Sequence, residues 1–385
     1  MLLLIAVANV ASWVPDPPLV GAGALDRGWV FARTTLIDGR SYPLFAMLFG
    51  FGLATIALRY DDAREAGRVL RRRGWWLAGF GLVHAIVFPG DVLGAYGLAA
   101  VLLSSLIAHR RRTALAALGI GLAVVATTTY YAASASFETG DPGQAGSLDI
   151  ITMPVPDRLG LWLASSIGSV LLTAVVPCIV IGVFIAHSGI LTTPWRHRRL
   201  LGLTAVGGLG LAVLLGIPAA LALLDDTLRV GVDALHGLGS YPGGVGWLAL
   251  IAFVVAGRAH ATPGSGPPEG SAAPNTPEAG WKPHAATPAS GPAALLSAIG
   301  KRSLTAYLCQ TLVFAPVFYA LHAAGLHDGL TPLAGAGIAV IVWVLAGLFC
   351  VALERAGRRG PFEALNRRLV YGWRPSVTAS SDATA

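Results

Sequence analysis

The class of fold is decided by one uncharged stretch, Pro332-Leu-Ala-Gly-Ala-Gly-Ile-Ala-Val-Ile-Val-Trp-Val-Leu-Ala-Gly-Leu-Phe-Cys-Val-Ala-Leu353. A helix needs about 20 mainly apolar residues to cross the hydrocarbon core of a bilayer, and this stretch is long enough. Nine further apolar segments lie along the chain, so the sequence predicts an all-α, polytopic membrane bundle of about ten helices. The ten segments are Met1–Val14, Tyr42–Leu58, Gly74–Phe88, Val92–Ala108, Thr113–Ala133, Leu159–Ala186, Leu200–Leu224, Gly237–Ala256, Leu304–Leu321 and Pro332–Leu353.

The composition of the chain excludes an ordinary soluble protein. Of its 385 residues, 55% are hydrophobic and 12% are charged, whereas soluble domains carry about 25% charged residues. The three cysteines, Cys178, Cys309 and Cys350, each lie in an apolar segment and lack ligand or disulfide spacing, so we expect no metal site. Met1–Val14 lacks the basic start of a signal peptide and is assigned to a membrane helix.

Basic residues are concentrated in alternate loops between the predicted spans. One set of loops, with the C-terminal tail, holds 22 of the 27 Lys and Arg residues, and the opposite set holds five. Because cytoplasmic loops carry the excess of Lys and Arg, ten spans place both termini in the cytoplasm, in the inner (plasma) membrane. We therefore interpret the net charge of +7 as a topology signal. The expected partners are the bilayer and anionic inner-leaflet lipids, with no nucleic acid.

Proline and glycine mark a linker between the eighth and ninth spans. Residues 258–293 hold 8 of the 24 prolines, a composition that predicts a disordered cytoplasmic loop. The loop separates an eight-span region, 1–257, from a two-span region, 294–372, and a disordered tail follows at 373–385. Within the second region, Gly360–Gly372 places apolar residues on one face, which predicts a short interfacial helix on the inner leaflet.

Several motifs together resemble one known family. They are Ser41-Tyr-Pro-Leu-Phe-Ala-Met-Leu-Phe-Gly-Phe-Gly52, Arg72-Arg-Gly-Trp-Trp-Leu-Ala-Gly-Phe-Gly-Leu-Val-His84, Gly90-Asp-Val-Leu-Gly-Ala-Tyr96, Gly300-Lys-Arg-Ser-Leu-Thr-Ala-Tyr-Leu-Cys-Gln310 and Gly360-Pro-Phe-Glu363 with Tyr371-Gly372. The combination resembles the YeiB-like family of bacterial membrane proteins, domain of unknown function 418, over nearly the whole chain. That family is distantly similar to the transmembrane acyltransferase superfamily, which implies acyl-coenzyme A as co-substrate. No other cofactor is evident.

The resemblance has one departure at the N-terminus. Members of the family open with an Asp-x-x-Arg-Gly stretch and then an Asn, whereas Ile5–Asn9 matches only the end of that motif. The first predicted span is also short. A misassigned start and a degenerate copy are the two explanations, and an activity that needs the missing Arg is in doubt for this sequence.

His84 and Asp91 are the candidate catalytic residues. His84 lies near the extracytoplasmic end of the third span and Asp91 lies in the turn into the fourth, and a turn this short makes the two helices antiparallel neighbours. A carboxylate beside an imidazole orients it and raises its basicity, as a general base for acyl transfer requires. The alternative is structural: His84 bonds a helix carbonyl, and Asp91 caps the fourth helix.

Polar residues within the predicted spans are candidates for substrate binding. Tyr307 and Gln310 share one face of the ninth span, and Asn9 and Tyr96 belong to the first and fourth; interhelical hydrogen bonding and packing are the alternatives. Arg71, Arg72 and Arg73 are candidates for the phosphates of coenzyme A. The alternative for these three is that they fix topology and touch anionic lipid.

These observations favour an acyltransferase that moves an acyl group to an envelope, sugar or lipid acceptor. His84 would be its general base and Asp91 the orienting partner. A transporter of a small solute is the alternative, although the predicted core has few ionisable groups and the chain has no evident two-fold repeat. A non-catalytic envelope protein is a third hypothesis.

Overall fold

The computed structural model describes residues 1–14, 22–136, 150–225, 231–260 and 291–372. Within these ranges every regular element is a helix and no strand occurs, so the predicted all-α class is confirmed. The helices are α1 (Leu2–Val10), α2 (Ala24–Leu36), α3 (Ser41–Ala57), α4 (Ala63–Ala85), α5 (Leu93–Ala108), α6 (Arg112–Ser136), α7 (Val155–Leu172), α8 (Val175–Ser188), the 3-10 helix η2 (Pro194–His197), α9 (Arg198–Asp225), α10 (Val232–Leu238), α11 (Ser240–His260), α12 (Pro292–Lys301), α13 (Ser303–Ala323), α14 (Pro332–Arg355) and α15 (Pro361–Tyr371).

Six helical stretches in the described ranges are long and apolar enough to cross a membrane. They are Ala24–Ala57, Arg112–Ala132, Pro194–Asp225, Val232–Gly257, Ser303–Ala323 and Pro332–Arg355, and the bent pair α7–α8 adds a seventh if it counts as one crossing. The other three predicted segments form α1, α4 and α5. Helices α1 and α5 have 9 and 16 residues, and α4 carries six charged residues in its first half. The helices fit a multi-pass membrane protein.

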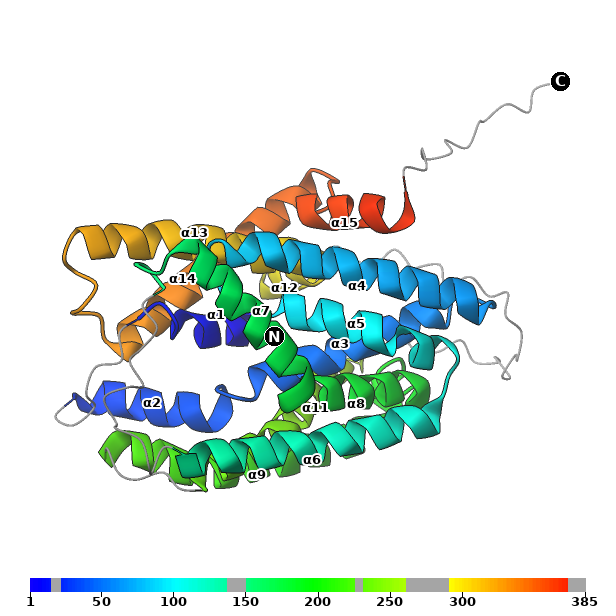
Figure 1. The fold of residues 1–385 in the computed structure, drawn as a ribbon, viewed down its shortest axis with the longest axis horizontal. Coiled ribbons are helices and arrows are strands. Elements are labelled where there is room, and N and C mark those ends of the chain that lie inside the picture. The colour runs from blue at the N-terminus through cyan, green and yellow to red at the C-terminus, as the bar shows by residue number, and fades with distance from the viewer. Residues whose placement is uncertain (15–21, 137–149, 226–230, 261–290, 373–385) are drawn as a thin grey trace.

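The long helices lie lengthwise beside one another, and α7 crosses α4, α5 and α6 obliquely (Figure 1). Close pairs such as α3 with α8 depend on glycine. A Cβ atom at Gly50 would overlap the carbonyl oxygen of Ile179, and one at Gly182 would overlap that of Met47. Small residues at such crossings let two backbones touch, which is how membrane helices associate without a hydrophobic driving force.

The sixth predicted span, Leu159–Ala186, is bent by 57° between α7 and α8. Thr173 at the break has an extended backbone. Pro177 lies in the first turn of α8; it lacks an N–H and its ring would clash with the carbonyl of residue 173 in a continuous helix. A new helix must therefore start just before Pro177, and the bend follows.

Three helices, α2, α10 and α12, lie where no helix was predicted. Helix α2 carries Asp26, Arg27 and Arg33, so the search for uncharged segments passed over it. Most of the predicted linker 258–293, and the whole predicted tail 373–385, lie outside the described residues. Helix α15 forms where the interfacial helix was predicted, and it packs against α4 and α13 with Phe362 edge-on to Phe80.

Candidate functional site

The centre of the candidate site is the turn between α4 and α5, residues 86–92. Helix α4 ends at Ala85, one residue after His84, and α5 begins at Leu93, two residues after Asp91. The turn brings Nδ1 of His84 to 2.7 Å from Oδ1 of Asp91. The His84 side chain is 5% exposed and that of Asp91 is 0% exposed. The pairing predicted from the short connection is therefore present in the structure.

Asp91 accepts hydrogen bonds from three further donors. Its Oδ1 accepts from the Tyr307 hydroxyl at 3.2 Å, and its Oδ2 accepts from the Gly94 N–H at 3.0 Å and the Trp162 Nε1–H at 3.3 Å. A carboxylate that faces only donors is best accommodated in its ionised form. Because Asp91 accepts, Nδ1 is the His84 nitrogen that donates to it, and in the neutral imidazole with this tautomer Nε2 is the acceptor.

The Nε2 atom of His84 is buried and has no hydrogen-bond partner. A buried polar atom without a partner is unfavourable by about 1–3 kcal/mol and calls for an explanation. Its unoccupied lone pair is the one with which an imidazole accepts a proton. The geometry therefore leaves the basic nitrogen available while Asp91 fixes the other one.

The α4–α5 turn is partly covered by protein, although Ile86 is exposed. Phe88, in the turn, is 1% exposed and stacks on Trp13 with ring centroids 5.8 Å apart. The buried Arg158 spans the turn from outside: its Nη1 donates to the Ile86 carbonyl at 2.9 Å, and its Nη2 donates to the Tyr319 hydroxyl at 2.7 Å. These contacts hold the turn in place over the buried His84–Asp91 pair.

The remaining candidates divide into two groups. Tyr307 joins His84 and Asp91 directly, and its ring centroid is 5.4 Å from that of His84. Asn9 and Tyr96 meet on Tyr42 instead: the Tyr42 hydroxyl donates to Asn9 Oδ1 at 2.9 Å, and Tyr96 donates to the Tyr42 carbonyl at 3.0 Å. Gln310 is buried, and neither of its side-chain polar atoms has a partner.

Two cavities border the site. The first, about 410 Å³, is called the arginine cavity here and is lined by Arg73, Leu93, Tyr307, Glu363 and Arg367, among others. The second, about 260 Å³, is called the hydroxyl cavity because seven hydroxyl-bearing residues lie in its wall beside Asp91: Tyr42, Tyr96, Tyr130, Ser165, Ser169, Thr173 and Ser240. Tyr307 and Asp91, which contact each other, thus face one cavity each. His84 lies behind this contact and lines neither of the two.

The arginine triplet does not act as one surface. Successive residues of a helix point about 100° apart, and accordingly only Arg73 lines the arginine cavity. Arg71 lines a separate groove with Arg64 and Arg68, and Arg72 lines neither. The Nε atom of Arg73 is buried without a partner.

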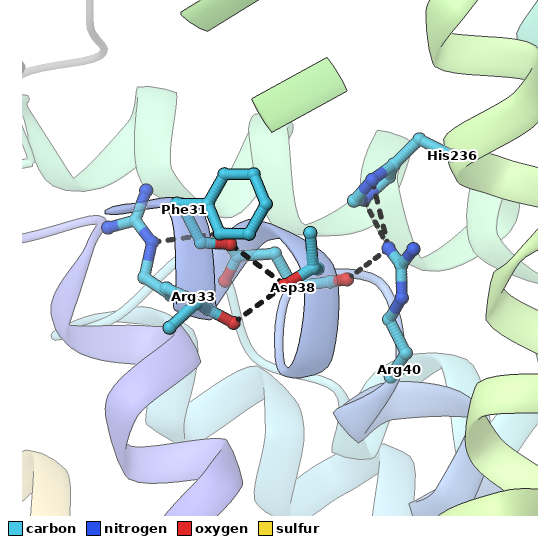
Figure 2. A network of polar contacts seen from close by, with 7 residues as sticks. Phe31, Arg33, Asp38, Arg40 and His236 are labelled. Atoms are coloured by element: carbon cyan, nitrogen blue, oxygen red, sulfur yellow. Dashed lines mark hydrogen bonds and ion pairs between the residues drawn. The ribbon is translucent and has the colours of Figure 1, made fainter. Parts of the chain in front are cut away.

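A second polar cluster, which the sequence did not single out, surrounds Arg40. This side chain is fully buried; its Nη1 contacts the His236 ring at 2.8 Å and donates to the Asp38 carbonyl at 2.7 Å, while Nη2 donates to the Ala212 carbonyl at 2.9 Å. Figure 2 shows Arg40 and His236 facing each other to one side of Asp38, whose carboxylate accepts from Arg33 at 2.8 Å. The cluster joins the start of α3 to α9 and α10. No sequence pattern links residues 196 positions apart.

Other missed residues are Tyr42, Arg158 and Trp162. An aromatic ring with a polar end inside a predicted span was the available signal for Tyr42 and Trp162, because buried Tyr and Trp usually find a hydrogen-bond partner. Among the residues that the structure describes, no group of three or more His, Cys, Asp or Glu is placed to hold a metal ion.

Residues 284–373 match the family model described as "Protein of unknown function (DUF418)". The match confirms the predicted resemblance to the YeiB-like, DUF418 family in this C-terminal region. Comparison with curated proteins and with solved structures gave no match.

Contacts within the matched region explain two of the motifs that carry the resemblance. Arg302, in the motif Gly300–Gln310, donates to the carboxylate of Glu354 and to the carbonyl of Arg358. Glu363, in the motif Gly360–Glu363, accepts from the backbone N–H of Thr305 at 2.9 Å and from the Thr305 hydroxyl. Gly360 leaves room for this contact, because a Cβ atom there would overlap the Glu363 carboxylate. The motifs therefore tie α15 and the end of α14 to the start of α13.

Proposed function

We propose that this protein is an integral membrane acyltransferase with His84 as its general base and Asp91 as the group that orients it. The observation that carries the proposal is the buried His84–Asp91 pair with an unpartnered Nε2 atom. Such a base typically contributes about 10²–10⁴-fold to the rate of a proton-transfer-limited step. The distant similarity of the YeiB-like family to membrane acyltransferases supports the same reaction class.

The proposed reaction transfers an acyl group from a thioester to a hydroxyl. The acceptor hydroxyl gives its proton to Nε2 of His84 while its oxygen bonds to the acyl carbon. The carbon–sulfur bond then breaks, and the departing sulfur takes the proton back from His84. Asp91 stays ionised throughout and stabilises the imidazolium that forms between the two steps. Because His84 lies behind the Asp91–Tyr307 contact, Tyr307 must move for the acceptor to reach Nε2.

The two cavities support an assignment of donor and acceptor. Arg73 and Arg367 in the arginine cavity would hold the phosphates of acyl-coenzyme A, since arginine binds phosphate oxygens through a planar fork of donors. The hydroxyl cavity would hold a hydroxyl-bearing sugar, lipid or envelope acceptor. Tyr42 and Tyr96 would contact this acceptor from the cavity wall, and Asn9 would position Tyr42 through their hydrogen bond. Gln310, buried with free polar atoms, is proposed as a further substrate contact.

We further propose ten membrane crossings with both termini in the cytoplasm of a bacterial cell. The count includes α1, α4 and α5 beside the seven crossings that length and composition support. The distribution of 22 of the 27 basic residues on one side supports this orientation.

Thiol release from acyl-coenzyme A by the purified full-length protein tests the proposed function. We expect His84→Gln to lower turnover by about 100-fold or more. The matched control is His187→Gln, because His187 is a partly buried histidine whose Nδ1 contacts a carbonyl of its own helix, Val183. Equal turnover by His84→Gln and the control would remove His84 from the mechanism.

A small-solute transporter is the second candidate, because a cavity lies on each side of the Asp91–Tyr307 contact. In such a protein this hydrogen bond would act as the gate between the two. Solute flux into proteoliposomes that persists without acyl-coenzyme A and rises in Tyr307→Phe would favour transport over acyl transfer.

A further inference from the structure

A basic groove lies between the first turns of α4 and the end of α5. It encloses about 290 Å³ and is lined by Ala63, Arg64, Gly67, Arg68, Arg71, Ser105 and His109. The three arginines are spaced at i, i+4 and i+7, so they form one row along α4. No residue of this groove belongs to the proposed reaction centre.

The arginines of the groove are free to bind a ligand. In the described parts of the chain, no carboxylate pairs with Arg64, Arg68 or Arg71, and all three are exposed. Asp62 accepts instead from the backbone N–H of residue 64, as the N-cap of α4. Glu65 lies three residues before Arg68 on α4, and within the described residues it forms no ion pair with any of the three arginines.

The opposite wall of the groove, at the end of α5, adds the hydroxyl-bearing Ser105 and His109. His109 directs Nδ1 to the Ser105 carbonyl at 2.9 Å, so its Nε2 faces outward at the end of α5. The groove thus gathers three arginines that, within the described residues, form no ion pair with a carboxylate.

Apolar side chains begin one turn deeper on the same two helices. Trp75, four residues after Arg71, is 59% exposed, and Leu102, three residues before Ser105, is 63% exposed. Tryptophan favours the boundary between headgroups and hydrocarbon. A row of arginines followed directly by exposed Trp and Leu has the polarity profile of a phospholipid, with its charge outside and its chains inside.

We propose that this groove is a binding site for the phosphate group of an anionic phospholipid on the face of the membrane that carries the basic loops. Arg64, Arg68 and Arg71 bind the phosphate oxygens, the Ser105 hydroxyl contributes a neutral donor, and the acyl chains lie along Trp75 and Leu102. The site specifies where on the protein the expected contact with anionic lipid occurs, and it does not depend on acyl transfer.

Native mass spectrometry of the full-length protein in neutral detergent, titrated with phosphatidylglycerol, tests the site. Each basic residue near an anionic surface changes binding by about fivefold, so the triple variant Arg64→Gln, Arg68→Gln, Arg71→Gln should bind about 100-fold more weakly. The single variant Arg68→Gln should bind about fivefold more weakly. The matched control removes three exposed arginines elsewhere on the same predicted side: Arg355→Gln, Arg358→Gln, Arg359→Gln. It should stay within threefold of the wild type.

Equal binding by the wild type and the groove triple variant, with unchanged melting temperatures, would overturn the proposal. Equal losses in the groove and control triple variants would overturn it too, because the effect would then be one of total charge. Glycerol 3-phosphate distinguishes a soluble phosphate compound from a lipid. Millimolar or weaker binding supports the lipid assignment, whereas binding as tight as that of phosphatidylglycerol overturns it.

Discussion

His84 and Asp91 are held by contacts that reach far beyond their own turn. Their pairing is local, since seven residues separate them, and the sequence predicted it from the short connection. Besides the local Gly94 N–H, the donors to Asp91 come from α7 and α13, and Tyr307 lies 216 positions away. A periodicity argument assigns Tyr307 to a helix face, but the packing of α13 against α1, α14 and α15 decides which face meets Asp91.

A glycine beside the pair gives a sharp test of this packing. A Cβ atom at Gly81 would lie 2.5 Å from Asp91 Oδ2 and 2.6 Å from the Gly94 nitrogen, whereas one at Gly79 would have nothing within 4 Å. Overpacking of this kind destabilises a protein by about 1–3 kcal/mol. We therefore expect Gly81→Ala to lower the thermal melting temperature in detergent and Gly79→Ala to leave it unchanged. Equal melting temperatures for the two variants would contradict the close contact between α4 and α5.

At the scale of elements, the sequence predicted helices well where they are uncharged. Each of the ten predicted segments overlaps a helix of the structure. Helix α2 was missed because Asp26, Arg27 and Arg33 interrupt its apolar pattern. The break between α7 and α8 was missed although Pro177 marks it, because hydropathy averaged over a window does not register a single proline. Counting apolar residues thus misses helix boundaries that are set by single charged residues or prolines.

Docking of α15 depends on a contact that the sequence shows only as a motif. Glu363 caps Thr305, which is fully buried at the start of α13. Leaving a buried donor without its charged acceptor costs about 1–3 kcal/mol, so Glu363→Ala should speed amide hydrogen exchange across Pro361–Tyr371 by about tenfold or more. Arg359→Ala, which alters an exposed side chain just before Gly360, is the control. Unchanged exchange in Glu363→Ala would show that other contacts dock α15.

At the scale of the whole molecule, charge predicts orientation and packing does not. The proposed ten-span topology places Thr192 on the cytoplasmic side and Asp328 on the opposite side, and both residues are exposed. In a background with Cys178, Cys309 and Cys350 replaced by Ala, an impermeant maleimide added to intact cells should label Asp328→Cys and spare Thr192→Cys. The reverse pattern would invert the orientation, and labelling of both positions would contradict the number of crossings between them.

The proposed function requires His84 and Asp91 to work as one catalytic unit, and a double-mutant cycle on acyl-coenzyme A turnover measures whether they do. Residues that act as a unit have strongly non-additive effects on rate. We predict that His84→Gln, combined with Asp91→Asn, loses no more turnover than His84→Gln alone, which itself loses about 100-fold or more. Losses that multiply across the two substitutions, or turnover that neither substitution changes, would show that the pair is not such a unit.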